Sequence, residues 1–310
     1  MTLIFKSGSD PWQDWQKSLK DAMPDLDCRD WDDTGDDDAV EYALVWKPPL
    51  GELRRRFRNL KVIFSLGAGV DHLLVDPDLP AGVPIVRMVE PELTRGMTEY
   101  VVLHVLRYHR LIPALEDQQK RHVWNVLPTP TAPKRRVGIM GLGVIGQDSL
   151  RVLSALGFAL SGWSRTAKSI PDVTCYHGRD GLSAFLAETE VLVCLLPYTA
   201  ETDNILNRDV FSCLPQGAYL INAGRGGLQD EDDILAALES GQLAGATLDV
   251  FRKEPLPVGH AFWDHTKVTI TPHNAGTAQH WSAAKEVIAN IRRIQKGQAL
   301  LNIADLSAGY

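Results

Sequence analysis

Three side chains suited to acid–base work on a carbonyl group lie beside glycine or proline residues in the last third of the chain. Arg225 is flanked by glycines, Glu254 precedes a proline and His273 follows one. The fork of N–H donors on an arginine can hold a carboxylate and polarise an adjacent keto oxygen. A histidine can donate a proton near neutral pH, and a neighbouring carboxylate can orient its ring and stabilise its charged form. These residue types predict reduction of a 2-keto acid, for which the hydride must come from a cofactor.

A glycine-rich turn predicts where that cofactor binds. The apolar run 137–140 has the character of a buried strand, and Gly141-Leu-Gly143-Val-Ile-Gly146 follows it, with a helical pattern after the last glycine. In this setting the first glycine allows a tight turn, the second lets backbone approach a pyrophosphate, and the third lets the helix pack on the strand. The helix N-terminus adds N–H donors. Gln147 stands where a nucleotide triphosphatase would need lysine, so the motif indicates a dinucleotide.

The segment Gly162-Trp-Ser164-Arg165-Thr-Ala-Lys168 falls where the next strand of this unit should end. An acidic residue usually accepts hydrogen bonds from the ribose 2′-hydroxyl at this position. Here Arg165 offers a donor fork suited to phosphate, Ser164 adds a hydroxyl and Lys168 a second positive charge. We therefore predict NADP(H) as the preferred cofactor, which favours the reductive direction, with NAD(H) as the alternative. The competing interpretation is that Arg165 and Lys168 are solvated loop cations.

The elements that must position these residues alternate between strand and helix, as in parallel sheets. The first part predicts strands at 3–5, 42–46, 62–66 and 84–86, with helices at 12–22 and 50–57. A mostly helical stretch over 92–120 and a proline-rich loop at 128–133 follow. The second part predicts strands at 136–140, 159–163, 191–196, 218–222, 244–249 and 268–271, and helices at 230–240 and 278–296. The three reactive side chains follow predicted strand ends, where ligand sites of open α/β sheets gather.

Composition narrows the class of protein. The chain has 310 residues, enough for two domains, and a net charge of −7 that argues against nucleic-acid or membrane-surface binding. The N-terminus has neither a signal peptide pattern nor a membrane span. The acid-rich segment 30–38 is interpreted as a solvated loop and the arginines of 54–58 as an exposed helix face.

Cysteine usage predicts a cytoplasmic protein without a metal site. The four cysteines, none in a C-x-x-C pair, are Cys28, Cys175, Cys194 and Cys213. Scattered single cysteines fit reduced thiols better than a disulfide framework or a zinc site.

Together these segments resemble the D-isomer-specific 2-hydroxyacid dehydrogenase family. The motifs that carry the resemblance are the 141–146 loop, Asn222-Ala-Gly-Arg225-Gly, Leu248-Asp-Val-Phe-Arg-Lys-Glu254-Pro and Thr271-Pro-His273. Stretches 42–46, 66–71, 163–166, 217–220 and 254–257 are similar to the reductases of glyoxylate and hydroxypyruvate within that family. The implied activity is NADPH-dependent reduction of glyoxylate to glycolate and of hydroxypyruvate to D-glycerate.

The family implies two doubly wound parallel-sheet domains of the α/β class with a cleft between them. Residues 1–97 and 277–310 would form a flavodoxin-like substrate domain, and residues 98–276 a Rossmann cofactor domain. The resemblance assigns catalysis to Arg225, Glu254 and His273, and it implies a homodimer built on the cofactor domain.

The resemblance also extends both binding sites. Besides the glycines and the 164–168 segment, it implies cofactor contacts for Leu142, Val144, Ile145, Leu196, Pro197, Ala223, Gly224, Asp249, Ala275 and Gly276. It places the substrate among Trp46, Ala68, Gly69, Arg225 and His273, with backbone N–H groups at Ala68 and Gly69 holding its carboxylate. The 67–69 turn can itself form an anion nest, or it can be a plain strand-to-helix turn. Trp46 can wall a pocket or be an ordinary buried aromatic.

Two other functions stay open at this stage. One is dehydrogenation of another substrate, because Ala223-Gly224 is smaller, and the segment after His273 less apolar, than in many relatives. The other is a non-catalytic NAD(P)-sensing regulator on the same fold. A sensor has no need of a proton donor, so the Arg225, Glu254 and His273 set weakens that alternative.

Overall fold

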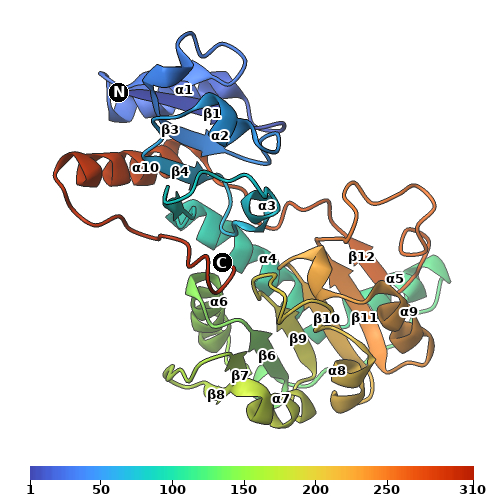
Figure 1. Cartoon of the computed structure of the whole chain (residues 1–310). Helices are drawn as coiled ribbons and strands as arrows, with labels where there is room; N and C mark the ends of the chain where they lie inside the picture. Colours follow the sequence, from blue (N-terminus) through green and yellow to red (C-terminus); the bar gives the residue numbers. More distant parts are fainter. The chain divides into compact units, whose positions relative to one another are not determined.

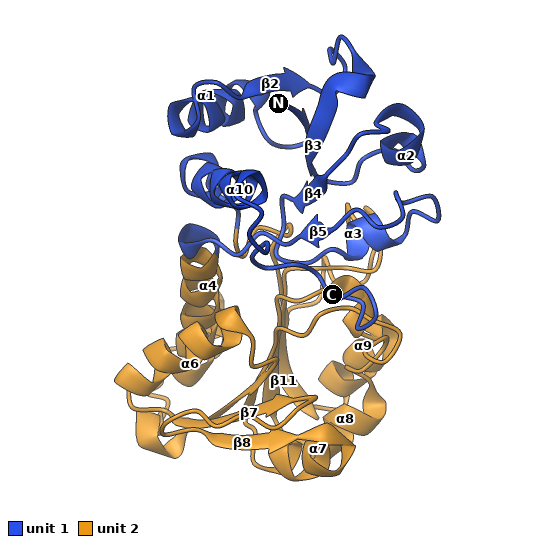
Figure 2. Ribbon diagram, turned by 60° about the vertical axis from the view of Figure 1, so that its left-hand side comes forward, with its two compact units in different colours: residues 1–93, 277–310 blue, residues 94–276 orange.

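The computed structural model describes residues 1–310, which divide into two compact units. Unit 1 contains Met1–Leu93 and Thr277–Tyr310, and unit 2 contains Thr94–Gly276 (Figures 1 and 2). The chain therefore leaves unit 1 once and returns to it with its last helix. The boundary predicted after residue 97 lies inside helix α4 (Pro91–His109), a few residues beyond this division.

Unit 1 is built on a parallel sheet with strand order β2-β1-β3-β4-β5. The strands are β1 (Thr2–Lys6), β2 (Asp27–Asp30), β3 (Val40–Val45), β4 (Val62–Ser65) and β5 (Ile85–Val86). The helices are α1 (Trp12–Ala22), η1 (Asp37–Ala39), α2 (Glu52–Arg56), α3 (Asp71–Leu74) and α10 (His280–Gln295). Helices α1 and α10 pack on each other, which joins the two ends of the chain within one unit. The strand order is that of flavodoxin-like folds.

Unit 2 is built on a larger parallel sheet with strand order β12-β11-β10-β9-β6-β7-β8. The strands are β6 (Arg136–Met140), β7 (Ala159–Ser164), β8 (Thr174–His177), β9 (Val191–Cys194), β10 (Ala218–Asn222), β11 (Leu243–Leu248) and β12 (Val268–Ile270). The helices are α4, α5 (Ile112–Lys120), η2 (Ala132–Lys134), α6 (Val144–Ala155), α7 (Gly178–Ala187), α8 (Arg208–Cys213), η3 (Gly226–Leu228) and α9 (Glu231–Glu239). The strand order reverses between β6 and β9. Ligands of Rossmann-type sheets bind outside the carboxyl ends of the strands at such a switch point.

The predicted strands and helices are present, and the missed elements have a common reason. Strands β2 and β8 and helices α7 and α8 were not predicted. The sequences DCRD of β2 and TCYH of β8 are too polar and too short to show the apolar run of a buried strand, because both are edge strands. The stretch predicted as helical over 92–120 is two helices, separated where Leu111 takes the left-handed φ of 57°.

One surface interpretation was wrong. Arg56 does not lie on an exposed helix face, because its Nε is 2.9 Å from Asp37 Oδ2 and its guanidinium lies 5.3 Å from the centre of the Trp31 ring. The acid-rich segment is accordingly tied to α2 through Asp37. The stacked, half-buried guanidinium stabilises this corner of unit 1.

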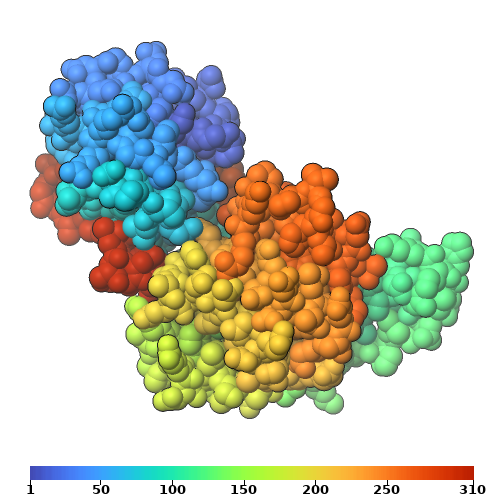
Figure 3. Space-filling view, turned by 45° about the vertical axis from the view of Figure 1, so that its right-hand side comes forward, coloured from blue at the N-terminus to red at the C-terminus, as the bar shows by residue number.

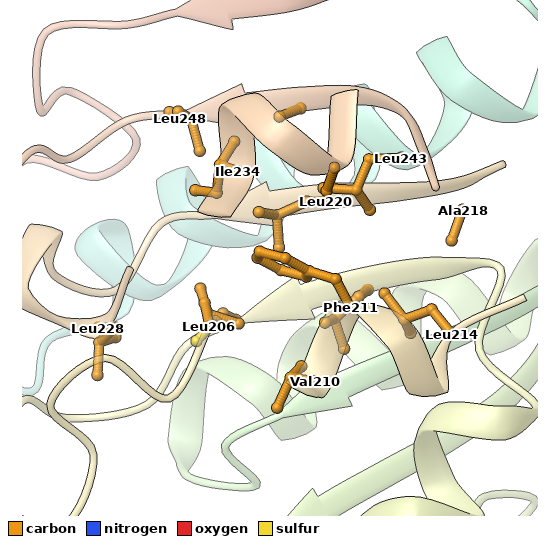
Figure 4. Packing of buried hydrophobic residues seen from close by; sticks show 14 of the residues in the cluster. Leu206, Val210, Phe211, Leu214, Ala218, Leu220, Leu228, Ile234, Leu243 and Leu248 are labelled. Carbon is orange, nitrogen blue, oxygen red and sulfur yellow. The ribbon is translucent and has the colours of Figure 1, made fainter. Parts of the chain in front are cut away.

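A contiguous apolar core supports the strand ends of unit 2. Phe211 of α8, Leu220 of β10, Ile234 of α9 and Leu243 of β11 are buried and point into one cluster (Figure 4). Asp230 caps α9 by accepting a hydrogen bond from the Asp233 N–H at 3.0 Å, as the sequence predicts. The loops that follow β10, β11 and β12 therefore start from rigid positions.

Candidate active site

The glycine loop separates positions that the fold requires from one that it leaves open. A Cβ at Gly146 would lie 2.0 Å from the carbonyl oxygen of Gly141, and Gly141 has a φ of 104°. Both glycines are thus needed for the turn and for the approach of α6 to β6. A Cβ at Gly143 would meet nothing within 4 Å. Its lack of a side chain keeps open the space before the N-terminus of α6, which fits a pyrophosphate group held by backbone N–H donors.

Loops from neighbouring strands close around this turn. A Cβ at Gly141 would lie 2.7 Å from the Leu195 carbonyl oxygen, and one at Gly224 would lie 2.9 Å from the Leu196 carbonyl oxygen. The segments after β6, β9 and β10 are therefore in direct contact. This arrangement brings together the predicted cofactor residues Gly141, Leu196 and Gly224.

The segment after β7 presents cations and no acid. Ser164 is buried, and its hydroxyl donates to the Thr166 carbonyl oxygen at 2.8 Å. In this arrangement the serine holds the turn, whereas the notion that it donates to a ligand stays a prediction. The side chains of Arg165 and Lys168 are exposed at the turn. A 2′-phosphate would meet positive charge here and no carboxylate.

Arg225 follows β10 on a loop that buried amides hold. The Asn222 Nδ2 donates to the Arg225 carbonyl oxygen at 3.2 Å and to Gln229 Oε1 at 2.8 Å, and Asn222 Oδ1 accepts from the Gly224 N–H at 3.1 Å. The guanidinium of Arg225 is half-buried, with Nη1 donating to the Gly224 carbonyl oxygen at 2.9 Å. The backbone of the loop is thus set by Asn222, while the side chain of Arg225 stays at its edge.

The next two reactive residues lie together. His273 Nδ1 is 2.9 Å from Glu254 Oε2 and 3.1 Å from Oε1, and the two side chains are 32% and 24% exposed. Glu254 Oε1 also accepts from the Phe251 N–H at 3.2 Å. A Cβ at Gly226 would lie 1.9 Å from the Phe251 carbonyl carbon, so the Arg225 loop packs on the Glu254 loop. Hydrogen bonding at Nδ1 orients the imidazole and directs Nε2 to proton exchange.

Asp249 organises the loop that carries His273. Its carboxylate is 2% exposed, and Oδ2 accepts from the Ala275 N–H at 3.0 Å. Oδ1 accepts from the Thr271 hydroxyl at 2.6 Å and from the Asn274 N–H at 3.0 Å. The cofactor contact predicted for Asp249 stays a prediction, because these bonds give its carboxylate a task within the protein.

The residues predicted to bind substrate in unit 1 also lie together. A Cβ at Gly67 would be 2.5 Å from the Trp46 ring, so the ring lies on this turn. The Ser65 hydroxyl is 3.0 Å from the Gly67 carbonyl oxygen and 3.1 Å from that of Gly69. Ser65 therefore holds the turn that carries the N–H groups of Ala68 and Gly69. Arg225 and His273, predicted for the same substrate, belong to unit 2.

Several anchoring residues were not predicted. They are Asn222, Gln229, Tyr100 and Thr271, all of which form buried or half-buried hydrogen bonds. A polar amide at the end of an apolar strand is a signal that could have indicated Asn222, since a buried amide needs partners. Their bonding partners come from distant parts of the sequence, which the pattern of residues does not reveal.

Two features bear on other classes of function. No group of three or more His, Cys, Asp or Glu side chains is arranged to hold a metal ion. Among the helices, none is both long enough and apolar enough to cross a membrane.

Comparison with known proteins gives consistent matches over the chain. Residues 102–275 match the model of the D-isomer specific 2-hydroxyacid dehydrogenase, NAD binding domain. The glyoxylate/hydroxypyruvate reductase A of Yersinia enterocolitica is 41% identical over 315 aligned residues, covering 100% of both chains.

Solved structures agree with this match. A D-isomer specific 2-hydroxyacid dehydrogenase from Xanthobacter autotrophicus, in complex with NADPH and MES, has a TM-score of 0.96 and 44% identity, covering 100% of this chain and 99% of that one. An NADPH-dependent glyoxylate/hydroxypyruvate reductase from Sinorhizobium meliloti, in complex with NADP and sulfate, has a TM-score of 0.94 and 41% identity over 100% and 99% of the two chains.

Proposed function

The chain belongs to the D-isomer specific 2-hydroxyacid dehydrogenase family, and from that premise we propose that it reduces glyoxylate and hydroxypyruvate with NADPH. The observation that carries the proposal is the 2.9 Å pair of His273 Nδ1 and Glu254 Oε2 beside the loop of Arg225. The products would be glycolate and D-glycerate. The relatives that bind NADPH or NADP support the choice of cofactor.

The residues that would hold the cofactor are those of the open glycine turn and the cationic segment after β7. The turn at Gly143 leaves space for the pyrophosphate, and Arg165 and Lys168 supply positive charge for a 2′-phosphate. The bound cofactor supplies the hydride. Unit 2 is therefore proposed as the cofactor domain and unit 1 as the substrate domain.

The chain's own side chains supply binding, polarisation and the proton. The Arg225 guanidinium holds the substrate carboxylate and polarises the keto oxygen. His273 delivers a proton from Nε2 to that oxygen, while Glu254 holds Nδ1 and stabilises the protonated ring before transfer. The N–H groups of Ala68 and Gly69 would bind the carboxylate from unit 1, with Trp46 as a wall.

Steady-state oxidation of NADPH with a panel of glyoxylate, hydroxypyruvate and bulkier 2-keto acids tests the proposal. We expect turnover with the two small substrates, and a loss of most of kcat in His273→Ala without loss of NADPH binding. Absence of turnover with every member of the panel would refute the enzymatic function. Tight NADPH binding in that case would identify a cofactor-sensing regulator.

We also propose that the protein is a cytoplasmic homodimer that associates through unit 2. The segment that follows α5 exposes apolar side chains, with Trp124 99% and Val126 84% exposed. Figure 3 shows α5 and the residues after it, in green, standing out from the rest of unit 2. Exposed apolar patches of this kind mark association surfaces. Sedimentation of the wild type and of Trp124→Asp tests this, because a monomeric wild type or a dimeric variant would contradict the proposed surface. The free cysteines support a reducing compartment, which cell fractionation would test.

A further inference from the structure

A polar stripe runs along the face of α4 that packs on β11 and β12. Tyr100, His104 and Tyr108 are spaced by four residues, so they share one face of the helix, and all three are buried. The Tyr108 hydroxyl lies 2.7 Å from Thr247 Oγ1, and His104 Nδ1 lies 3.4 Å from the same atom. The Tyr100 hydroxyl lies 2.7 Å from Thr271 Oγ1, just before the loop that carries His273.

The hydrogen bonds at the Tyr100 end form a chain with one direction. The Thr271 hydroxyl donates to Asp249 Oδ1 at 2.6 Å, so it accepts its other bond from the Tyr100 hydroxyl. Asp249 in turn accepts from the N–H groups of Asn274 and Ala275. The chain therefore begins on α4 and ends on the backbone next to His273.

The backbone of His273 needs such support. Its φ is 54°, in the left-handed region that residues with side chains rarely adopt. The His273 N–H donates to the Asp249 carbonyl oxygen at 2.8 Å, and the next two N–H groups donate to the Asp249 carboxylate. This conformation sets the direction in which the imidazole leaves the backbone, and hence its contact with Glu254.

Helix α4 also meets the loop directly. A Cβ at Gly96 would lie 3.6 Å from Gly276 Cα and 3.8 Å from the Ala275 carbonyl oxygen. The helix thus abuts the segment after His273 at one turn and bonds to the segment before it at the next. Displacement of either contact would be felt at His273.

We propose that Tyr100 and Thr271 are positioning residues that hold His273 in its working orientation through the carboxylate of Asp249. The inference rests on the proposed function and deepens it, because neither residue is one of the three reactive side chains. Tyr108 provides the matched control. It lies on the same helix face, is buried and makes a 2.7 Å bond to a threonine of β11, but that bond does not reach the His273 loop.

The experiment compares Tyr100→Phe with Tyr108→Phe, each of which removes one hydroxyl and keeps the ring. We expect both to lose similar thermal stability. Tyr100→Phe should lower kcat about three- to ten-fold, the effect of one neutral hydrogen bond, with KM for NADPH unchanged. Tyr108→Phe should leave kcat within about two-fold.

Thr271 variants test whether the effect travels along the chain of bonds. Thr271→Val should lower kcat at least as much as Tyr100→Phe, and Thr271→Ser should restore it because the hydroxyl returns. The double variant Tyr100→Phe with Thr271→Val should be no slower than Thr271→Val alone, since both break one chain. Equal kcat in the two Tyr→Phe variants, or additive losses in the double variant, would overturn the proposal.

A second readout is independent of turnover. Amide hydrogen exchange of Asn274 and Ala275 should be faster in Tyr100→Phe than in Tyr108→Phe, because the Asp249 carboxylate that accepts from them is less firmly held. Equal exchange in the two variants would overturn the positioning role even if the wild type reduces both substrates. Faster exchange in a protein that reduces no keto acid would instead refute the proposed function alone.

Discussion

Replacing Glu254 by glutamine removes one charge from the centre of the proposed reaction while keeping the shape of the side chain. The amide can still accept one hydrogen bond from His273 Nδ1, which faces both carboxylate oxygens at 2.9 and 3.1 Å. The variant therefore isolates the electrostatic part of the interaction. We expect kcat to fall because the protonated imidazole that delivers the proton is no longer stabilised.

The geometry sets the size of this effect. Opposite charges about 4 Å apart attract by about 4 kcal/mol at an effective dielectric constant near 20, and by about 1 kcal/mol in bulk water. His273 and Glu254 are 32% and 24% exposed, which places the pair between these limits. A loss of about 1.5–3 kcal/mol corresponds to a fall in kcat of roughly ten- to a hundred-fold.

The assay is NADPH oxidation at saturating keto acid, with NADPH affinity measured separately by fluorescence. Glu231→Gln is the matched control, because Glu231 Oε2 pairs with His260 Nε2 at 3.3 Å at similar exposure in the same unit. The control should keep kcat within about two-fold, since a partly exposed ion pair contributes only modestly to stability. A Glu254→Gln enzyme as fast as the wild type would show that the carboxylate does not stabilise the proton donor.

Three further predictions concern the cofactor site and acid stability. Arg165→Asp should lower the ratio of kcat/KM for NADPH over NADH by at least about ten-fold, because a charge-assisted bond to the 2′-phosphate is replaced by repulsion; an unchanged ratio would leave Arg165 as a solvated cation. Gly143→Ala should fold normally but bind NADPH weakly, whereas Gly146→Ala should be destabilised, because its Cβ would lie 2.0 Å from a carbonyl oxygen; thermal melts and NADPH titrations separate the two, and equal melting temperatures would contradict the distinction. Burial of His104 lowers its pKa from 6.5 to about 4, so the unfolded chain binds a proton first as the pH falls. The free energy of unfolding should thus decrease between about pH 6.5 and pH 4 by up to about 3 kcal/mol from this residue, and urea titrations of His104→Phe, which lacks the proton site, should show a smaller decrease than the wild type.

Local patterns in the sequence were sufficient for most of the fold and for the residues that carry chemistry. Buried central strands such as β6 and β10 are apolar throughout, so their bounds were predicted to the residue. The glycine spacing at 141–146 predicts the turn, since each glycine meets a backbone requirement or an open space. Edge strand β8 escaped prediction because a strand that is half solvated does not need an apolar run.

The sequence by itself determined which side chains can react: an arginine, a glutamate and a histidine after strand ends, a glycine turn for a dinucleotide, and a cation at Arg165 where an acid is usual. Only the tertiary structure decided how they are held. The pairing of His273 with Glu254, the left-handed backbone at His273 and its support by Asp249, Thr271 and Tyr100 join residues up to 171 positions apart in the chain. Hydrogen bonds of this kind depend on which strands are neighbours and on how α4 packs against them. Packing of the whole unit sets those distances, and residue spacing along the chain does not encode them.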